Sequence, residues 1–85
     1  MVRSRGGEVN LPDGIAASGS LVVIGLGYVG LPLALRASEV GFQVTGLDTS
    51  PTTVDSLNDG RSHVDDVSDA DVAGMLEAGF SATID

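Results

Sequence analysis

Short apolar runs alternate with segments of helical periodicity along most of the chain. Residues 21–24 are all apolar and mostly β-branched, and a glycine follows them. This pattern is typical of a strand that is buried on both faces of a parallel sheet. Residues 42–47 and 80–84 predict two further strands, the first of which ends at Asp48.

The segment after the first predicted strand indicates an amphipathic helix. Over residues 28–40, Val29, Leu33, Ala37 and Val40 recur three to four positions apart. This spacing places them on one side of a helix, because an α-helix has 3.6 residues per turn. We expect this apolar side to pack against the sheet.

Two shorter helices are expected after the second strand. Ser50 followed by Pro51 is typical of a helix start and predicts a helix through about Asn58. Ser68 and Asp71 have the spacing of a capping box, with aspartate in place of the usual glutamate or glutamine. They predict a helix through about residue 78. Its apolar side would be formed by Val72, Met75 and Leu76.

The resulting order, β-α-β-α-α-β, predicts an α/β fold in which right-handed crossovers connect the strands of a parallel sheet. Residues 61–67 predict a polar loop within it. Residues 1–20 mix glycine, serine, proline and charged residues without a period, which predicts a flexible leader. The chain is therefore expected to consist of this leader and one folded unit, residues 21–85.

The charge balance excludes several classes of partner. Twelve acidic residues against four arginines give a formal net charge of −8. We therefore expect neither nucleic-acid binding nor attachment to an anionic membrane, since both depend on a basic patch. A phosphate ligand is compatible with this charge, because backbone N–H groups at a helix start bind anions without basic side chains.

The sequence also argues against metal, disulfide and export chemistry. It contains no cysteine and therefore no disulfide, thiolate metal site or cysteine nucleophile. Asp65, Asp66, Asp69 and Asp71 lack the ligand spacing of a calcium-binding loop, and we expect no metal site. No apolar run is long enough for a membrane span, and the first twenty residues lack the core of a secretory signal. We expect a cytoplasmic protein.

A glycine-rich motif lies between the first predicted strand and the first predicted helix. Gly25, Gly27 and Gly30 match the G-x-G-x-x-G pattern of dinucleotide-binding proteins. In this motif the first glycine permits a tight turn, the second lets the backbone approach a pyrophosphate, and the third lets the helix pack closely on the strand. The motif predicts a Rossmann-like domain. Because complete domains of this type need about 150 residues, we expect this chain to hold an incomplete one.

Asp48 strengthens the prediction of a dinucleotide site. It ends the second predicted strand, 18 residues after Gly30. An acid at about this spacing accepts hydrogen bonds from the hydroxyls of the adenosine ribose. It would repel the 2′-phosphate of NADP, and no basic residue follows it in residues 49–53. We therefore predict NAD as the cofactor.

The residues around the motif resemble those of the UDP-glucose/GDP-mannose dehydrogenase family. In residues 23–34 the run GYVGLP follows the first predicted strand, as it does in that family. The likeness covers residues 21–85. It continues at residues 41–44, 46–48, 57–60 and 82–85. Residues 62–67 are more similar to the members that act on UDP-N-acetyl-hexosamines than to UDP-glucose dehydrogenases.

The resemblance implies an enzyme of polysaccharide biosynthesis that oxidises the C6 alcohol of a UDP-sugar to a carboxylate and reduces two NAD. In the family, a cysteine, a lysine and an asparagine far downstream carry out this chemistry, and the C-terminal half holds the sugar nucleotide. We therefore expect no catalytic residue in residues 1–85 and no activity from this chain alone. The intact protein would be a homo-oligomer.

Only the cofactor side of the family's site carries over to this sequence. Thr53 stands where the family often has a lysine, so we do not count it among the residues expected to bind NAD. His63, the only histidine, has no nucleophile beside it, and we interpret it as a solvated loop residue. The residues expected to bind NAD are Gly25, Leu26, Gly27, Tyr28, Val29, Gly30, Asp48 and Thr83.

Two other functions stay open at this point. The chain could be a non-catalytic NAD-binding module, or it could belong to the 6-phosphogluconate and β-hydroxyacid dehydrogenases, although Tyr28 and Asp48 disfavour the latter. In a doubly wound sheet, the strand at residues 21–24 is central, and its second neighbour would come after Asp85. We therefore expect an unpaired edge on this strand and poor folding of the isolated chain.

Overall fold

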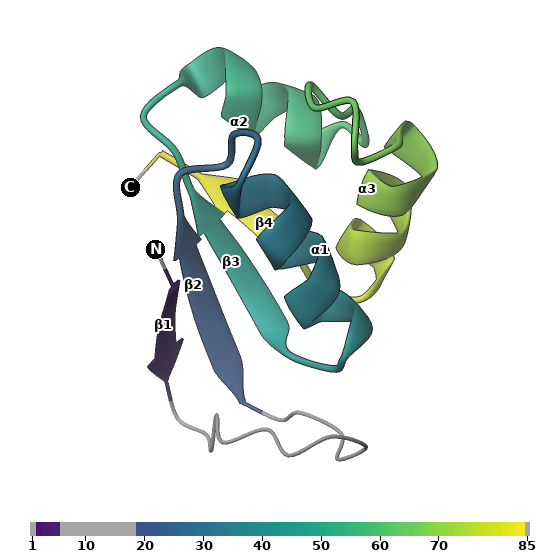
Figure 1. Cartoon of the computed structure of the whole chain (residues 1–85). Coiled ribbons are helices and arrows are strands. Elements are labelled where there is room, and N and C mark those ends of the chain that lie inside the picture. The colour runs from purple at the N-terminus through teal and green to yellow at the C-terminus, as the bar shows by residue number, and fades with distance from the viewer. Residues whose placement is uncertain (1, 6–18, 85) are drawn as a thin grey trace.

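The computed structural model describes residues 2–5 and 19–84 (Figure 1), and it confirms the predicted α/β fold. Four strands form one sheet in the order β1-β2-β3-β4. Strands β2 (Ser20–Ile24), β3 (Gln43–Leu47) and β4 (Ser81–Thr83) are parallel. The three helices are α1 (Gly30–Glu39), α2 (Pro51–Asn58) and α3 (Asp69–Glu77).

The hydrophobic core lies between the sheet and the helices. Alternate residues of β2 and β3, namely Leu21, Val23 and Val44, are buried in one cluster with the apolar residues of the helices. This alternation follows from the two-residue period of a strand. The side chains with no exposed surface are Val23, Leu26, Leu31, Ala34, Leu57 and Val72. Burying a valine or leucine side chain stabilises a fold by about 1.5–3 kcal/mol, so the valines and leucines in this set each contribute substantially.

The apolar face predicted for α1 is correct only in its second half. Ala37 is buried and Val40 packs against the core, as predicted, but Val29 and Leu33 are 82% and 40% exposed. Leu31 and Ala34 are buried in their place. Two sets of positions satisfy the same helical spacing, and the sequence pattern does not distinguish them. The packing of the start of the helix against the preceding loop fixes the phase, as described below.

The starts of α2 and α3 are capped as predicted. The Ser50 hydroxyl accepts a hydrogen bond from the Thr53 N–H at 3.2 Å. At α3, the Ser68 hydroxyl accepts from the Asp71 N–H, and the Asp71 carboxylate accepts from the Ser68 N–H, both at 3.0 Å. Aspartate therefore closes this capping box in place of the usual glutamate.

The connection between α2 and α3 is a loop, as predicted, but it is not polar throughout. Val64 and Val67 are almost completely buried in the core. The Ser62 hydroxyl stabilises the turn locally, because it both accepts from the Val64 N–H and donates to the Val64 carbonyl. The loop is therefore anchored to the domain at two points, and the residues before Val64 have a defined position.

The first residues of the chain differ from the predicted leader. Val2–Arg5 form β1, which pairs antiparallel with β2 in the register Val2↔Val23 to Arg5↔Ser20. The β2 edge that we expected to be unpaired is therefore occupied by β1. Ser20, the last residue of the predicted leader, belongs to β2, and residues 1 and 6–18 lie outside the described residues. Among the helices that the structure describes, none is long and apolar enough to cross a membrane.

Candidate cofactor site

The candidate site lies where the parallel strands end. The carboxyl ends of β2, β3 and β4 meet at one edge of the sheet, and the glycine-rich loop leaves β2 there and enters α1 (Figure 1). The loop continues the ladder for one residue, because the Gly25 N–H donates to the Leu47 carbonyl at 2.7 Å. Ligands of open α/β sheets bind at this edge.

Gly25 and Gly30 are required by the fold itself. Gly25 has a φ of +87°, which residues with a Cβ rarely adopt. A Cβ atom on Gly30 would lie 1.6 Å from the Gly25 carbonyl oxygen. The first turn of α1 therefore packs directly on the backbone that leaves β2, and this contact sets the phase of the helix.

Gly27 has a different environment. A Cβ atom built on it would meet no atom within 4 Å, and its φ is not positive. Its carbonyl accepts a hydrogen bond from the Leu31 N–H at 3.0 Å. The protein fold therefore does not require glycine at position 27. The absence of a side chain leaves open space beside the backbone, as a closely approaching ligand would need.

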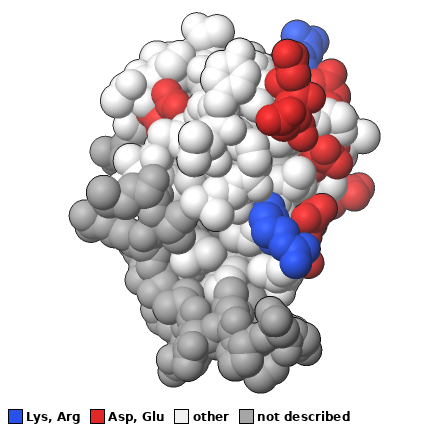
Figure 2. Space-filling view, viewed as in Figure 1, with Lys and Arg blue, Asp and Glu red and all other residues white. Residues whose placement is uncertain are grey.

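The start of α1 has no side-chain cap. Its N-cap residue is Val29, and no acidic residue lies in the first turn. Tyr28 and Val29 are 73% and 82% exposed, so their side chains leave the backbone of this turn near the surface. Figure 2 shows that acidic side chains gather over α3 and the loop before it, whereas the surface over the start of α1 carries no charged side chain in this view. The helix dipole makes such a start favourable for an anion.

Leu26, which we predicted to bind the cofactor, has a buried side chain. It lies over β3, where a Cβ atom on Gly46 would be 2.6 Å from Leu26 Cδ1. Gly46 therefore leaves room for this leucine. Only the backbone of Leu26 can contact a ligand.

Asp48 is held by backbone donors at the end of β3. Its Oδ2 accepts from the Leu26 N–H and its Oδ1 from the Ser50 N–H, both at 2.9 Å. These two bonds, the Leu26 bond first, lower the pKa of Asp48 below its ordinary value of 3.8, although partial burial opposes the change. The carboxylate is therefore charged at neutral pH. Each oxygen of an ionised carboxylate has a second acceptor site, so Asp48 can still accept from ligand hydroxyls.

A cavity of about 320 Å³ opens beside this carboxylate. Its lining residues are Ile24, Gly25, Leu47, Asp48, Thr49 and Ile84. Thr83 is next to Leu47 in the sheet register, and its carbonyl accepts from the Asp48 N–H at 3.0 Å. The cavity thus combines apolar walls with one carboxylate, which suits the adenosine part of a dinucleotide.

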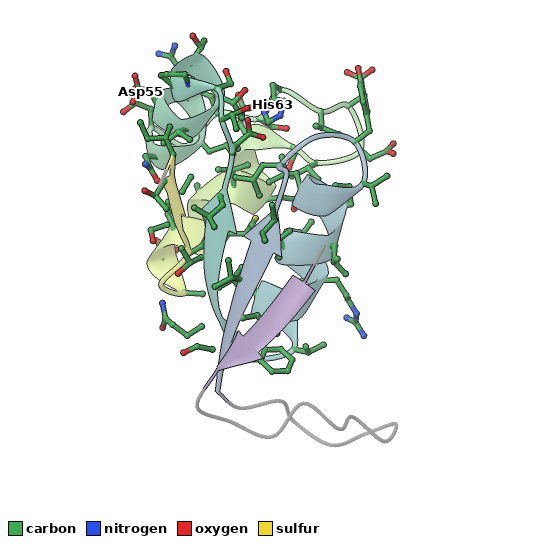
Figure 3. The ribbon with its side chains drawn as sticks, turned by 90° about the vertical axis from the view of Figure 1, so that its left-hand side faces the viewer. Asp55 and His63 are labelled. Atoms are coloured by element: carbon green, nitrogen blue, oxygen red, sulfur yellow. The ribbon has the colours of Figure 1, made fainter. Side chains whose placement is uncertain are left out.

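His63, which we interpreted as a solvated loop residue, makes a contact in this region that the sequence does not predict. The residue is exposed, but its ring is not surrounded by solvent, because Nε2 lies 2.6 Å from the Leu26 carbonyl oxygen. Figure 3 shows His63 near the ends of the strands, between the loop before α3 and the glycine-rich loop. The ring also contributes to the lowered pKa of Asp48. No motif in the sequence connects two residues that are 37 positions apart.

These features fit a dinucleotide better than a metal ion. The uncapped helix start and the open space at Gly27 suit a pyrophosphate, and the Asp48 carboxylate suits a ribose. Among the residues that the structure describes, no group of three or more metal-ligating side chains comes together.

Comparisons with known proteins agree with this site. Residues 20–84 match the model of the NAD-binding domain of the UDP-glucose/GDP-mannose dehydrogenase family. Over 62 residues, 72% of this chain, it is 39% identical to the UDP-N-acetyl-D-mannosamine dehydrogenase of Salmonella typhi, of which it covers 15%. No solved structure matches the chain significantly.

Proteins from two other organisms are also similar to this chain. The UDP-N-acetyl-D-mannosamine dehydrogenase of Pyrococcus horikoshii is 36% identical over 44 residues, which are 52% of this chain and 10% of that protein. The NDP-N-acetyl-D-galactosaminuronic acid dehydrogenase of Ralstonia nicotianae is 40% identical over 45 residues, 53% of this chain and 11% of that protein. The chain thus spans 15% or less of the length of these relatives. Their names confirm the predicted likeness to the hexosamine branch.

Proposed function

The chain belongs to the UDP-glucose/GDP-mannose dehydrogenase family, with NAD as its cofactor, and from this premise we propose that it is the adenosine- and pyrophosphate-binding part of a nucleotide-sugar dehydrogenase. The observation that carries the proposal is the pairing of an uncapped α1 start with an ionised Asp48 across one loop. Both lie at the edge of the sheet where the strands end.

Different residues would bind different parts of the cofactor. The backbone at Gly27 and the first turn of α1 would hold the pyrophosphate, because the Gly30 N–H has no partner among the described residues and the helix start is the positive end of the dipole. Asp48 would accept from the ribose hydroxyls, and the cavity walls Ile24 and Ile84 would contact the adenine. Gly25, Gly30 and the Leu26 side chain would act by shaping the loop. Thr83 supports Asp48 from β4.

The substrate and reaction follow from the family and its hexosamine relatives. We propose that the intact protein oxidises the C6 alcohol of a UDP-N-acetyl-hexosamine to a carboxylate. Bound NAD would supply the hydride acceptor, twice per turnover. The sugar pocket and the catalytic residues would lie outside residues 1–85, so this chain alone would be inactive. A cytoplasmic, homo-oligomeric protein is part of the same proposal.

A non-catalytic NAD-binding module is the alternative. It shares every feature of the cofactor site, so NAD binding does not distinguish the two functions. A protein that contains this chain together with a nucleotide-sugar pocket should form NADH from a UDP-N-acetyl-hexosamine. A protein that binds NAD with the same residues, but produces no NADH with any UDP-sugar, would favour the module.

The cofactor proposal is tested through Asp48. We expect calorimetric titration to show that wild type binds NAD more tightly than NADP. Asp48→Ala should weaken NAD binding about 10- to 100-fold, because hydrogen bonds to a charged group contribute about 1.5–3 kcal/mol. Asp55→Ala is the matched control, since it removes the same charge from an exposed site on α2 (Figure 3). Equal affinity of wild type for NAD and NADP would contradict the role of Asp48.

A further inference from the structure

The peptide groups of Leu26 are held from two sides. Its N–H donates to Asp48 Oδ2 at 2.9 Å, and its carbonyl lies 2.6 Å from His63 Nε2. Asp48 comes from the end of β3, and His63 comes from the loop between α2 and α3. Two segments that are distant in sequence therefore fix the backbone at the first variable position of the glycine-rich loop.

This contact determines which ring nitrogen of His63 carries a proton. A carbonyl oxygen can only accept a hydrogen bond, so Nε2 must be the donor. The Leu26 carbonyl belongs to the same planar peptide unit as the Gly27 N–H, and in a trans peptide the two groups point in opposite directions. The structure contains no cis peptide bond among its described residues. A carbonyl directed at His63 therefore directs the Gly27 N–H away from His63.

The surroundings of Gly27 agree with this orientation. No residue in the described part of the chain accepts a hydrogen bond from the Gly27 N–H, and a Cβ on Gly27 would meet open space. By contrast, Val64 and Val67 are buried in the core and anchor the loop that carries His63. The exposed His63 ring thus adds little to the core, and its contact with Leu26 acts mainly on the glycine-rich loop.

We propose that His63 is a positioning residue for the cofactor: its Nε2–H holds the peptide between Leu26 and Gly27 so that the Gly27 N–H donates to the pyrophosphate. This inference rests on the proposed NAD site. It gives the loop between α2 and α3 a role in phosphate binding. The glycine motif alone does not predict this role. Removing the donor lets this peptide rotate and lowers affinity only for ligands that carry the phosphates.

The test uses variants that differ in this donor. His63→Gln keeps an N–H donor at a similar reach from the backbone, whereas His63→Met has a similar length and no donor. Asp65→Asn is the control, since it changes an exposed residue of the same loop. Each variant is made in the intact protein that contains this chain and is titrated by NMR with ADP-ribose, which contains the pyrophosphate, and with adenosine, which does not.

We expect His63→Met to bind ADP-ribose about three- to tenfold more weakly, which corresponds to one hydrogen bond, and to bind adenosine like wild type. His63→Gln should restore ADP-ribose binding to within about twofold of wild type by the same reasoning. The Gly27 amide signal should shift with ADP-ribose in wild type and in His63→Gln, but less in His63→Met. Thermal unfolding without ligand checks that the three variants are folded.

Several results would overturn the proposal. Unchanged ADP-ribose affinity in His63→Met would show that the donor does not act on the phosphate site. Equal losses for adenosine and ADP-ribose, or equal losses in the Gln and Met variants, would show a purely structural role for the ring. In all these cases wild type still binds both ligands, and the proposed NAD site stands. If wild type binds neither ligand, the proposed function fails, and the role of His63 fails with it.

Discussion

Helices α1 and α3 begin in opposite ways, although both pack against the same core. At α3, Ser68 and Asp71 form two reciprocal hydrogen bonds, and Asp69 and Asp71 place negative charge at the positive end of the dipole. At α1, the N-cap is Val29, which forms no side-chain cap, and the first turn holds no acid. One helix start is closed by its own side chains, and the other is left open.

The difference separates two ways of stabilising a helix start. A capping residue contributes about 1 kcal/mol locally, and α3 uses it. The start of α1 lacks this contribution and is held instead by tertiary contacts: Gly30 packs on the Gly25 carbonyl, and Leu31 and Ala34 are fully buried. In the first turn of α1, the Leu31 N–H donates to the Gly27 carbonyl and Pro32 has no N–H, so the Gly30 N–H is the donor left for a ligand among these three residues. Packing replaces the cap.

The largest expected effect on stability is at the contact of Gly30 with the Gly25 carbonyl, which replaces a cap at α1. Gly30→Ala should destabilise the domain by about 3 kcal/mol or more, because its Cβ meets backbone that cannot move without displacing β2. Gly74→Ala in α3 is the matched control, since its Cβ meets open space and should stabilise by about 0.5–1 kcal/mol. Urea unfolding measures both. Equal effects would refute the claim that packing holds the start of α1.

The second prediction concerns a negative charge placed at the uncapped start of α1. Val29→Asp should weaken NAD binding about tenfold, because the carboxylate repels the phosphates at this exposed position. The same change should leave stability unchanged or raise it by up to about 1 kcal/mol, through the helix dipole. Val29→Thr keeps the shape without the charge and should bind NAD like wild type. If Val29→Asp binds NAD normally, the phosphates do not lie at this turn.

A smaller effect is expected at the closed helix start. Ser68→Ala removes the side-chain acceptor of the Asp71 N–H and should lower the free energy of unfolding by about 1 kcal/mol. NAD affinity should not change, since α3 begins away from the glycine-rich loop. Ser68→Thr retains the acceptor and serves as the control. A loss of NAD affinity in Ser68→Ala would show that the two helix starts are coupled.

Local signals in the sequence were sufficient for much of this architecture. The spacing of Ser68 and Asp71 predicted the capping box, and Ser50 with Pro51 predicted the bounds of α2, because each feature depends on neighbouring residues. The glycine motif also placed the loop between β2 and α1 correctly, and the family match confirmed NAD as the cofactor.

Features that depend on distant contacts could not be predicted in this way. The buried face of α1 is fixed by Gly30 against Gly25, and the helical period alone allows either phase. The pairing of β1 with β2 and the contact of His63 with Leu26 join segments that carry no shared sequence signal. The NAD-binding role of the individual residues stays a prediction until the variants above are measured.

The smallest expected effect concerns pH and the carboxylate that faces the open helix start. The Leu26 and Ser50 N–H groups lower the pKa of Asp48 in the folded state, so the ionised form contributes to stability above the unfolded value, near 3.8. That contribution is lost as pH falls through the lowered folded pKa. Because Asp48 is only partly buried, solvent screening should limit this contribution to less than about 1 kcal/mol.

Chemical unfolding of wild type and Asp48→Asn, followed from neutral to strongly acidic pH, measures this contribution. The stability advantage of wild type should shrink only as pH falls below about 3.8 and through the lowered folded pKa of Asp48. A difference that is constant across this range would show that the Leu26 and Ser50 bonds do not favour the charged carboxylate.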